Sequence, residues 1–264
     1  MDLGIRGRRA IVTGGSMGIG RATARELLLE GVHVAICARD AARLEQTRKE
    51  LAGDPGGQVV AVPTDMRNAA DVARLVDEAT RRLGGVDILV NNAGTFHAGR
   101  FDATTDEGMQ NQLNTKLFGF LRAIRLVAPQ MKERGWGRIV NIIGGAGKEP
   151  DPFMLVSGVT NSALLNLTKS LATEFGPFNV LVNAVCPGWV DTAVWRNNAA
   201  GWQKELGVAS DEEARRATTR RNSLGRFGRA DELANAIAFL CSERASYITG
   251  VSINVDGGRL KSLW

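Results

Sequence analysis

The chain has 264 residues, of which 44% are hydrophobic and 23% are charged, and its formal net charge is +5. These proportions are typical of a globular protein and exclude a largely disordered chain. The length is within the range of one α/β domain, so we predict a single domain over 1–264. Basic residues are interleaved with acids, as in 43–50. This pattern indicates a solvated surface, and we expect no nucleic-acid partner.

The chain has three isolated cysteines and two histidines, without the spacing of metal ligands, and we predict no metal site. Isolated cysteines suit the reducing cytoplasm, where we expect the protein to reside. No apolar signal region precedes the first predicted strand. No stretch approaches the roughly 18 apolar residues of a membrane span, so we predict no membrane association.

Short apolar runs alternate with longer stretches of helical periodicity along the chain. The predicted strands cover 9–13, 32–38, 58–62, 87–90, 138–143, 180–185 and 251–255. The predicted helices cover 18–30, 41–52, 69–83, 106–134, 153–175 and 230–243. This alternation predicts a Rossmann-type, doubly wound α/β fold, with a mostly parallel sheet covered by helices on both faces. Ligands of such sheets bind beyond the carboxyl ends of the strands.

The segment 189–228 interrupts this alternation, because it is polar and irregular. We interpret it as a substrate-side insertion or lid over the ligand crevice. It contains Trp189, Trp195 and Trp202. These side chains favour either a bulky apolar ligand or core packing beneath a lid.

A glycine-rich turn, TGGSMGIG over 13–20, lies between the first predicted strand and the first predicted helix. Glycines permit a tight turn and let the backbone approach a pyrophosphate, which the helix N-terminus also attracts. The strand–helix context predicts a dinucleotide site here, rather than only a structural turn. The predicted contacts are Gly14, Ser16, Met17, Gly18, Ile19 and Gly20.

The end of the second predicted strand, Cys37-Ala38-Arg39-Asp40, indicates which dinucleotide binds. An acid at this strand end would bind the ribose hydroxyls of NAD, whereas a cation would bind the 2′-phosphate of NADP. With Ala38 at the strand end and Arg39 next to it, the sequence favours NADP(H). NAD(H) stays possible through Asp40 if the register shifts by two residues, and Arg39 would then be a plain surface charge.

Further motifs follow the predicted strands. They are Asp65, NNAG at 91–94, Asn114, Pro187-Gly188, SLGRFG at 223–228, SYITG at 246–250 and NVDGG at 254–258. With the glycine turn, they resemble the short-chain dehydrogenases/reductases over the whole chain. The resemblance implies a seven-stranded sheet, a small-molecule substrate and a homodimer or homotetramer. It also implies cofactor contacts from Asp65, Met66, Asn92, Ala93, Gly94, Pro187, Gly188, Val190 and Thr192, although Asn92 has the alternative role of stabilising a strand.

The chemistry of that family uses a Ser after the fifth strand and a Tyr and a Lys spaced YxxxK on the next helix. The resemblance places the Ser position at Gly144, the Tyr position at Ser157 and the Lys position at Asn161. Of the four usual residues only Asn114 is present, and the single tyrosine, Tyr247, is distant in sequence. The resemblance thus implies a divergent member without the standard catalytic Tyr and Lys.

The candidate catalytic residues are therefore Asn114, Ser157, Asn161 and His97. A serine hydroxyl is shorter than a phenol and a weaker acid, so Ser157 would need an adjacent base. An imidazole titrates close to neutral pH, which makes His97 a candidate proton carrier. The alternatives are a polar helix face and an exposed loop histidine without catalytic roles. A further acid/base set, or only a charged loop, is formed by Lys148, Glu149 and Asp151.

The sequence leaves three functions open. The first is an NADP(H)-dependent oxidoreductase that acts on a carbonyl or an alcohol by a non-standard proton-transfer arrangement. The second is a non-redox lyase or isomerase in the same pocket. The third is a cofactor-binding module, or a partner subunit, without activity of its own.

Overall fold

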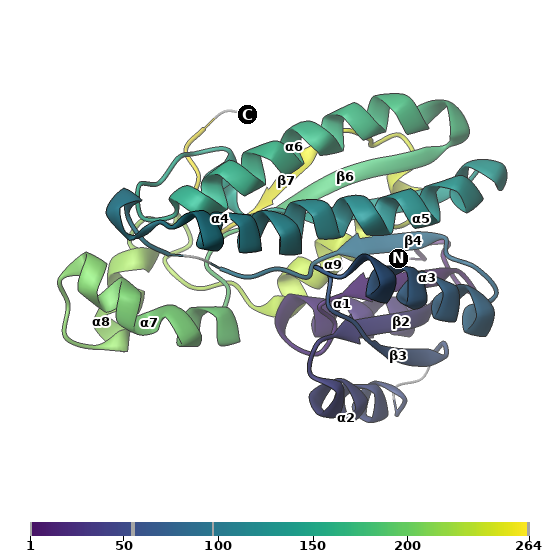
Figure 1. The fold of residues 1–264 in the computed structure, drawn as a ribbon, viewed down its shortest axis with the longest axis horizontal. Coiled ribbons are helices and arrows are strands. Elements are labelled where there is room, and N and C mark those ends of the chain that lie inside the picture. The colour runs from purple at the N-terminus through teal and green to yellow at the C-terminus, as the bar shows by residue number, and fades with distance from the viewer. Residues whose placement is uncertain (1, 54–55, 97, 263–264) are drawn as a thin grey trace.

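A parallel sheet forms the centre of the molecule (Figure 1). The computed structural model describes residues 2–53, 56–96 and 98–262. Its seven strands lie in the order β3-β2-β1-β4-β5-β6-β7, which confirms the predicted doubly wound fold. The strands are β1 (Arg9–Thr13), β2 (His33–Ala38), β3 (Val59–Pro63), β4 (Ile88–Asn91), β5 (Gly137–Ile142), β6 (Val180–Pro187) and β7 (Ser252–Val255).

Helices cover both faces of the sheet. The apolar core against α1, α2 and α9 lies on one face, and the core against α3, α5 and the end of α6 lies on the other. The α-helices are α1 (Gly18–Leu29), α2 (Ala41–Leu51), α3 (Ala69–Leu83), α4 (Asp106–Gln112), α5 (Gly119–Glu133), α6 (Leu155–Phe175), α7 (Ala193–Leu206), α8 (Asp211–Thr219) and α9 (Ala230–Leu240). Short 3-10 turns are η1 (Phe101–Ala103), η3 (Gly145–Gly147), η4 (Gly176–Phe178) and η5 (Glu243–Ala245).

Local sequence explains these elements. The strands are continuously apolar because both faces of the sheet are covered, and Ile88, Leu89 and Val90 of β4 are fully buried. The helix α3 begins where the Asn68 side chain accepts hydrogen bonds from two backbone N–H groups of the first turn. It ends at Gly84, whose left-handed backbone conformation suits glycine.

The predicted helix over 106–134 is divided in the structure. A π-helical turn, η2 (Leu113–Phe118), separates α4 from α5. The guanidinium of Arg122 stabilises this turn, because it donates hydrogen bonds to the carbonyl oxygens of Asn114 and Met66, at 3.2 and 3.1 Å. Such turns insert one residue into a helix and often occur at functional sites. From this turn, Lys116 donates a hydrogen bond to Asn161 of α6.

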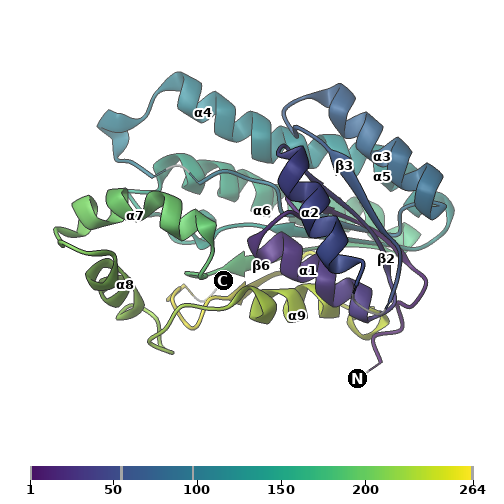
Figure 2. The same cartoon turned by 90° about the horizontal axis from the view of Figure 1, so that it is seen from below.

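The segment 189–228 contains α7 and α8, which lie together beyond one end of the sheet (Figures 1 and 2). Trp195 and Trp202 of α7 are buried, at 3% and 4% exposure. The role of the segment as a lid stays a prediction. None of the helices in the described ranges combines the length and the apolar character needed to cross a bilayer.

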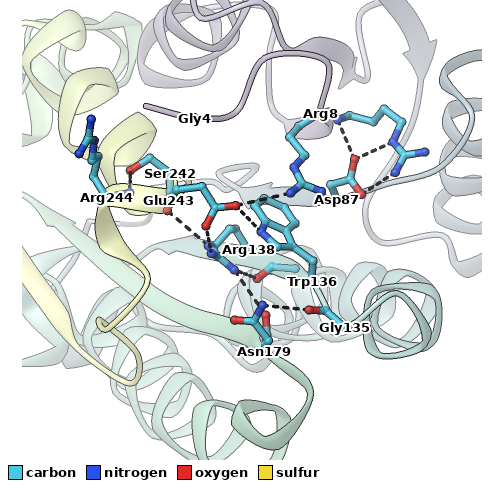
Figure 3. A network of polar contacts seen from close by, with 12 residues as sticks. Gly4, Arg8, Asp87, Gly135, Trp136, Arg138, Asn179, Ser242, Glu243 and Arg244 are labelled. Carbon is cyan, nitrogen blue, oxygen red and sulfur yellow. Dashed lines mark hydrogen bonds and ion pairs between the residues drawn. The ribbon is translucent and has the colours of Figure 1, made fainter. Parts of the chain in front are cut away.

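A polar network joins the amino ends of the strands (Figure 3). Arg9, at the start of β1, forms two hydrogen bonds of 2.6 Å with the buried carboxylate of Asp87. Arg138, at the start of β5, is 1% exposed and pairs with Glu243 at 3.4 Å. Glu243 also accepts a hydrogen bond of 2.8 Å from the indole of Trp136. This edge of the sheet is thus held by arginines that are paired with acids.

Candidate active site

Two adjoining cavities lie at the opposite edge, beyond the carboxyl ends of the strands. The larger has a volume of about 660 Å³ and the smaller about 190 Å³. Both are lined by Ile19, Thr95, Thr192 and Val194, so the two cavities share a wall. This edge is where doubly wound sheets bind their ligands.

The larger cavity gathers most of the predicted cofactor contacts. It is lined by Gly14, Ser16, Met17, Gly18, Ile19, Arg39, Asp65, Met66, Asn92, Ala93, Gly94 and Thr192. Pro187, Gly188 and Val190 line the smaller cavity instead. Residues that sequence reasoning did not name also line the larger cavity, among them Arg43 and Thr115.

The glycine turn needs glycine at two of its positions. Gly14 has a φ of +66°, and a Cβ atom there would lie 2.9 Å from Nδ2 of Asn92. Gly20 lines neither cavity, but a Cβ atom on it would lie 2.3 Å from the carbonyl oxygen of Gly14. The Asn92 amide donates to the carbonyl oxygens of Thr13 and Gly14, at 2.9 and 3.2 Å. Gly20 and Asn92 therefore hold the turn in the shape that opens the cavity.

The strand end that distinguishes the two dinucleotides carries cations. The strand β2 ends at Ala38, with Arg39 next to it. The carboxylate of Asp40 accepts a hydrogen bond from the backbone N–H of Arg43, at 3.0 Å, and so begins α2. Arg39, Asp40 and Arg43 all line the cavity. Arg43 lies in the first turn of α2, four residues after Arg39, and this nearness in sequence is the signal that could have identified it.

The smaller cavity brings together the three positions that the sequence resemblance assigned to Ser, Tyr and Lys. Gly144, Ser157 and Asn161 all line it. A Cβ atom on Gly144 would lie 2.8 Å from Nδ2 of Asn161, so the glycine leaves space for this amide. The ammonium of Lys116 donates a hydrogen bond of 2.8 Å to Oδ1 of Asn161. A lysine from a different helix thus reaches this group of residues.

Lys116 is the residue that sequence reasoning missed. It lies in the π-helical turn η2 and lines the smaller cavity. Removal of its ammonium from water lowers the pKa of Lys116 to about 8, an effect that the nearby thiol of Cys186 opposes. Lys116 lies two residues after Asn114, and no sequence motif marked it. Only the tertiary structure identifies Lys116, because its hydrogen bond to Asn161 joins segments that are distant in sequence.

The other candidates lie elsewhere or have structural partners. Asn114 lines neither cavity, and its side-chain oxygen accepts a hydrogen bond of 2.8 Å from Arg122. The Lys148 ammonium donates to the carbonyl oxygen of Ser252 and to Oδ1 of Asn254, at 2.7 and 2.8 Å, which joins its loop to β7. His97 lies outside the described residues. Within the described chain, no group of three or more His, Cys, Asp or Glu residues could hold a metal ion.

Aromatic side chains form one wall of the smaller cavity. Trp189, Trp195, Trp202 and Phe96 all line it. The rings of Trp189 and Trp202 meet edge to face with centroids 4.7 Å apart, and those of Trp195 and Trp202 stack at 6.0 Å. The tryptophans therefore pack on one another and also line the cavity, and their contact with a bulky apolar ligand stays a prediction.

Comparison with known proteins identifies the family. A family model described as enoyl-(acyl carrier protein) reductase matches residues 14–259. The chain belongs to the short-chain dehydrogenase/reductase family. The 3-oxoacyl-[acyl-carrier-protein] reductase FabG of Aquifex aeolicus is 34% identical over 258 residues, which cover 98% of this chain and 99% of that protein. The NADPH-dependent reductase BacG of Bacillus subtilis is 32% identical, over 97% and 99% of the two chains.

A solved structure shows the same fold in detail. The L-sorbose reductase of Gluconobacter frateurii, complexed with NADPH and L-sorbose, has a TM-score of 0.93 and 35% identity, with full coverage of both chains. Similarity at this level extends over the sheet, the glycine turn and the edge that carries both cavities. The larger cavity lies at the edge of the sheet where doubly wound folds bind dinucleotides.

Proposed function

We propose that this chain is an NADP(H)-dependent oxidoreductase that acts on a carbonyl or an alcohol in the smaller cavity. Proton transfer is arranged around Lys116 and Asn161 in place of the family's Ser-Tyr-Lys set. The observation that carries the proposal is the 2.8 Å hydrogen bond from the Lys116 ammonium to Asn161, in a cavity that adjoins the larger one. Relatives described as NADPH-dependent, or solved with NADPH, support the choice of cofactor.

The larger cavity would hold the dinucleotide. The glycine turn, with the N-terminus of α1, would take the pyrophosphate. Arg39 and Arg43 would take the 2′-phosphate, because guanidinium groups bind phosphate oxygens through paired N–H donors. When bound, the cofactor supplies or accepts a hydride.

Lys116 is the proton donor for reduction of a carbonyl. Its protonated form gives a proton to the substrate oxygen as negative charge develops there, so an N–H bond breaks and an O–H bond forms. The Asn161 amide orients the ammonium through the hydrogen bond at 2.8 Å. A pKa of about 8 makes this lysine a stronger acid than one in water, because burial destabilises its charged form.

Titration with NADPH and NADH, followed by a panel of ketones and aldehydes, tests the proposal. Replacement of both Arg39 and Arg43 by Ala should weaken NADPH binding about ten- to hundredfold and leave NADH binding unchanged. Turnover should oxidise NADPH with at least one carbonyl class. Tight NADPH binding without turnover on the whole panel would favour the binding-module alternative instead.

Variants of Lys116 separate proton transfer from charge. Lys116→Met should lower kcat about 10²- to 10³-fold with unchanged NADPH affinity. Lys116→Arg keeps the positive charge but cannot release a proton near neutral pH, so it should be almost as slow. The exposed Lys49→Met is the matched control. Full activity of the Lys116→Arg variant would mean that the lysine acts only through its charge.

Assembly and location are also proposed from the family resemblance. Phe118, Leu126 and Val159 are exposed apolar side chains on η2, α5 and α6. We infer that these helices contact a second copy in a homodimer or homotetramer. Sedimentation that gives a monomer at micromolar concentration would contradict this. Residence in the cytoplasm stays a prediction.

A further inference from the structure

Arg259 is a second cation in the smaller cavity. It follows the NVDGG motif after β7 and lines the cavity together with Lys116. Its guanidinium lies over the ring of Trp189, 4.7 Å from the ring centroid. Across the described part of the chain, no Asp or Glu forms an ion pair with it.

The nearby carboxylates have other partners. The two carboxylate oxygens of Asp256 accept hydrogen bonds from backbone N–H groups of the same loop, at 2.9 and 2.8 Å. Asp151 accepts one at 2.9 Å, and Glu149 one at 3.3 Å. Burial and the positive charge of Arg221 lower the pKa of Arg259, although these three acids oppose the shift. The guanidinium is therefore largely removed from water, and the three nearby carboxylates act on it from a distance without forming an ion pair with it.

The described side chains that line the cavity carry positive charge and no negative charge. Its described ionisable side chains are Lys116 and Arg259, both cationic, and no described Asp or Glu lines it. The two consecutive glycines of the loop after β5 make space for the polar groups. A Cβ atom on Gly144 would meet Asn161, and one on Gly145 would lie 3.3 Å from Nη1 of Arg259. The cavity thus joins one proton-carrying cation, one permanent cation and an aromatic wall.

We propose that Arg259 binds the carboxylate of the substrate, which is an aromatic or otherwise apolar oxo acid or its hydroxy-acid product. This inference rests on the proposed function and adds the substrate class to it. A planar guanidinium binds a carboxylate through two parallel hydrogen bonds. The face of Trp189 keeps the guanidinium in place, and the remaining tryptophans contact the apolar part of the substrate. Lys116 then faces the carbonyl that is reduced.

Phenylglyoxylate and its uncharged methyl ester are the paired probes. NADPH oxidation should show a KM for the acid about ten- to hundredfold lower than that for the ester. Arg259→Met should raise the KM for the acid by the same factor and leave the KM for the ester unchanged. Arg259→Lys should lie between the two, because it keeps the charge but loses the paired geometry. The exposed Arg82→Met is the control.

Binding without turnover separates this inference from the proposed function. Phenylglyoxylate and phenylpyruvate are titrated calorimetrically into the NADP⁺-saturated protein, the Arg259→Met variant and the control. Binding that is ten- to hundredfold weaker in Arg259→Met supports the carboxylate site even if NADPH is never oxidised, a result that would count against the proposed function alone. Turnover of the ester with equal KM values for acid and ester overturns the carboxylate site. Absence of acid binding to the wild-type protein also overturns it.

Discussion

The cations at the two edges of the sheet have opposite surroundings. At the amino ends of the strands, Arg9 pairs with Asp87 and the buried Arg138 pairs with Glu243. At the carboxyl ends, Lys116 donates a hydrogen bond to a neutral amide and Arg259 lies over the indole of Trp189, and within the described residues neither cation forms an ion pair with an acid. A partly buried charge without an opposite charge costs stability. We therefore interpret the edge with ion pairs as structural, and we propose that the edge without them binds a ligand.

The largest expected loss of stability follows from a substitution at the amino ends of the strands, where the arginines form ion pairs. Replacement of Asp87 by Ala removes a carboxylate whose side chain is 1% exposed and leaves Arg9 and Arg134 without their shared partner. We expect a loss of about 2–4 kcal/mol in the free energy of unfolding, measured with urea. The control is Glu78→Ala in the exposed pair with Arg81, which should cost less than about 0.5 kcal/mol. Equal losses in the two variants would contradict the structural role.

The pH dependence of activity tests the proposed role of Lys116 at the carboxyl ends of the strands. In the proposed reduction Lys116 donates the proton, so its protonated form is the active one, and burial lowers the pKa of this lysine to about 8. We expect kcat for reduction to be level below pH 8 and to fall about tenfold per pH unit above it. Oxidation of the alcohol should show the reverse slope and level off above pH 8. Identical profiles for the wild type and Lys116→Met would exclude this lysine as the group that titrates.

A smaller effect is expected when a side chain is added beside Asn161. The Cβ atom of Gly144→Ser would lie 2.8 Å from Nδ2 of Asn161 and would displace that amide. The Lys116–Asn161 hydrogen bond then lengthens, and we expect kcat to fall about tenfold with little change in KM for NADPH. Gly176→Ser, where a Cβ atom meets nothing within 4 Å, is the control. A faster Gly144→Ser enzyme would mean that the family's serine position still works here.

The sequence predicts the fold well because the relevant signals are local. Continuous apolar runs mark buried parallel strands, and the predicted 9–13 agrees with β1. Most of the predicted cofactor contacts line one cavity for the same reason, since the glycine turn lies between one strand and one helix, and their contact with a cofactor stays a prediction. The predicted helix over 106–134 was wrong at the π-helical turn η2. That turn depends on Arg122, which lies on the next helix and contacts Asn114 across it.

The two cations of the smaller cavity were missed because they meet through the tertiary structure. Lys116 lies 45 residues from Asn161 in the chain, and they form one hydrogen bond. Arg259 directly follows the NVDGG motif. This motif indicates the family, but it does not show which groups surround the Arg259 side chain. Whether a cation is paired depends on every element packed around it. Patterns along one segment do not contain that information.

The thermal stability of two arginine variants, one from each edge of the sheet, tests whether the cations at the two edges have different roles. Arg259→Met removes a guanidinium that burial destabilises, while the methionine can keep contact with Trp189, so we expect a Tm equal to the wild type or about 1–3 °C higher. Arg138→Met removes a side chain that donates to the carbonyl oxygen of Gly137 and pairs with Glu243, and its Tm should fall by several degrees. Calorimetry of the ligand-free protein measures both. A fall of similar size in Arg259→Met would mean that this arginine stabilises the fold. The arginines at both edges would then have a structural role.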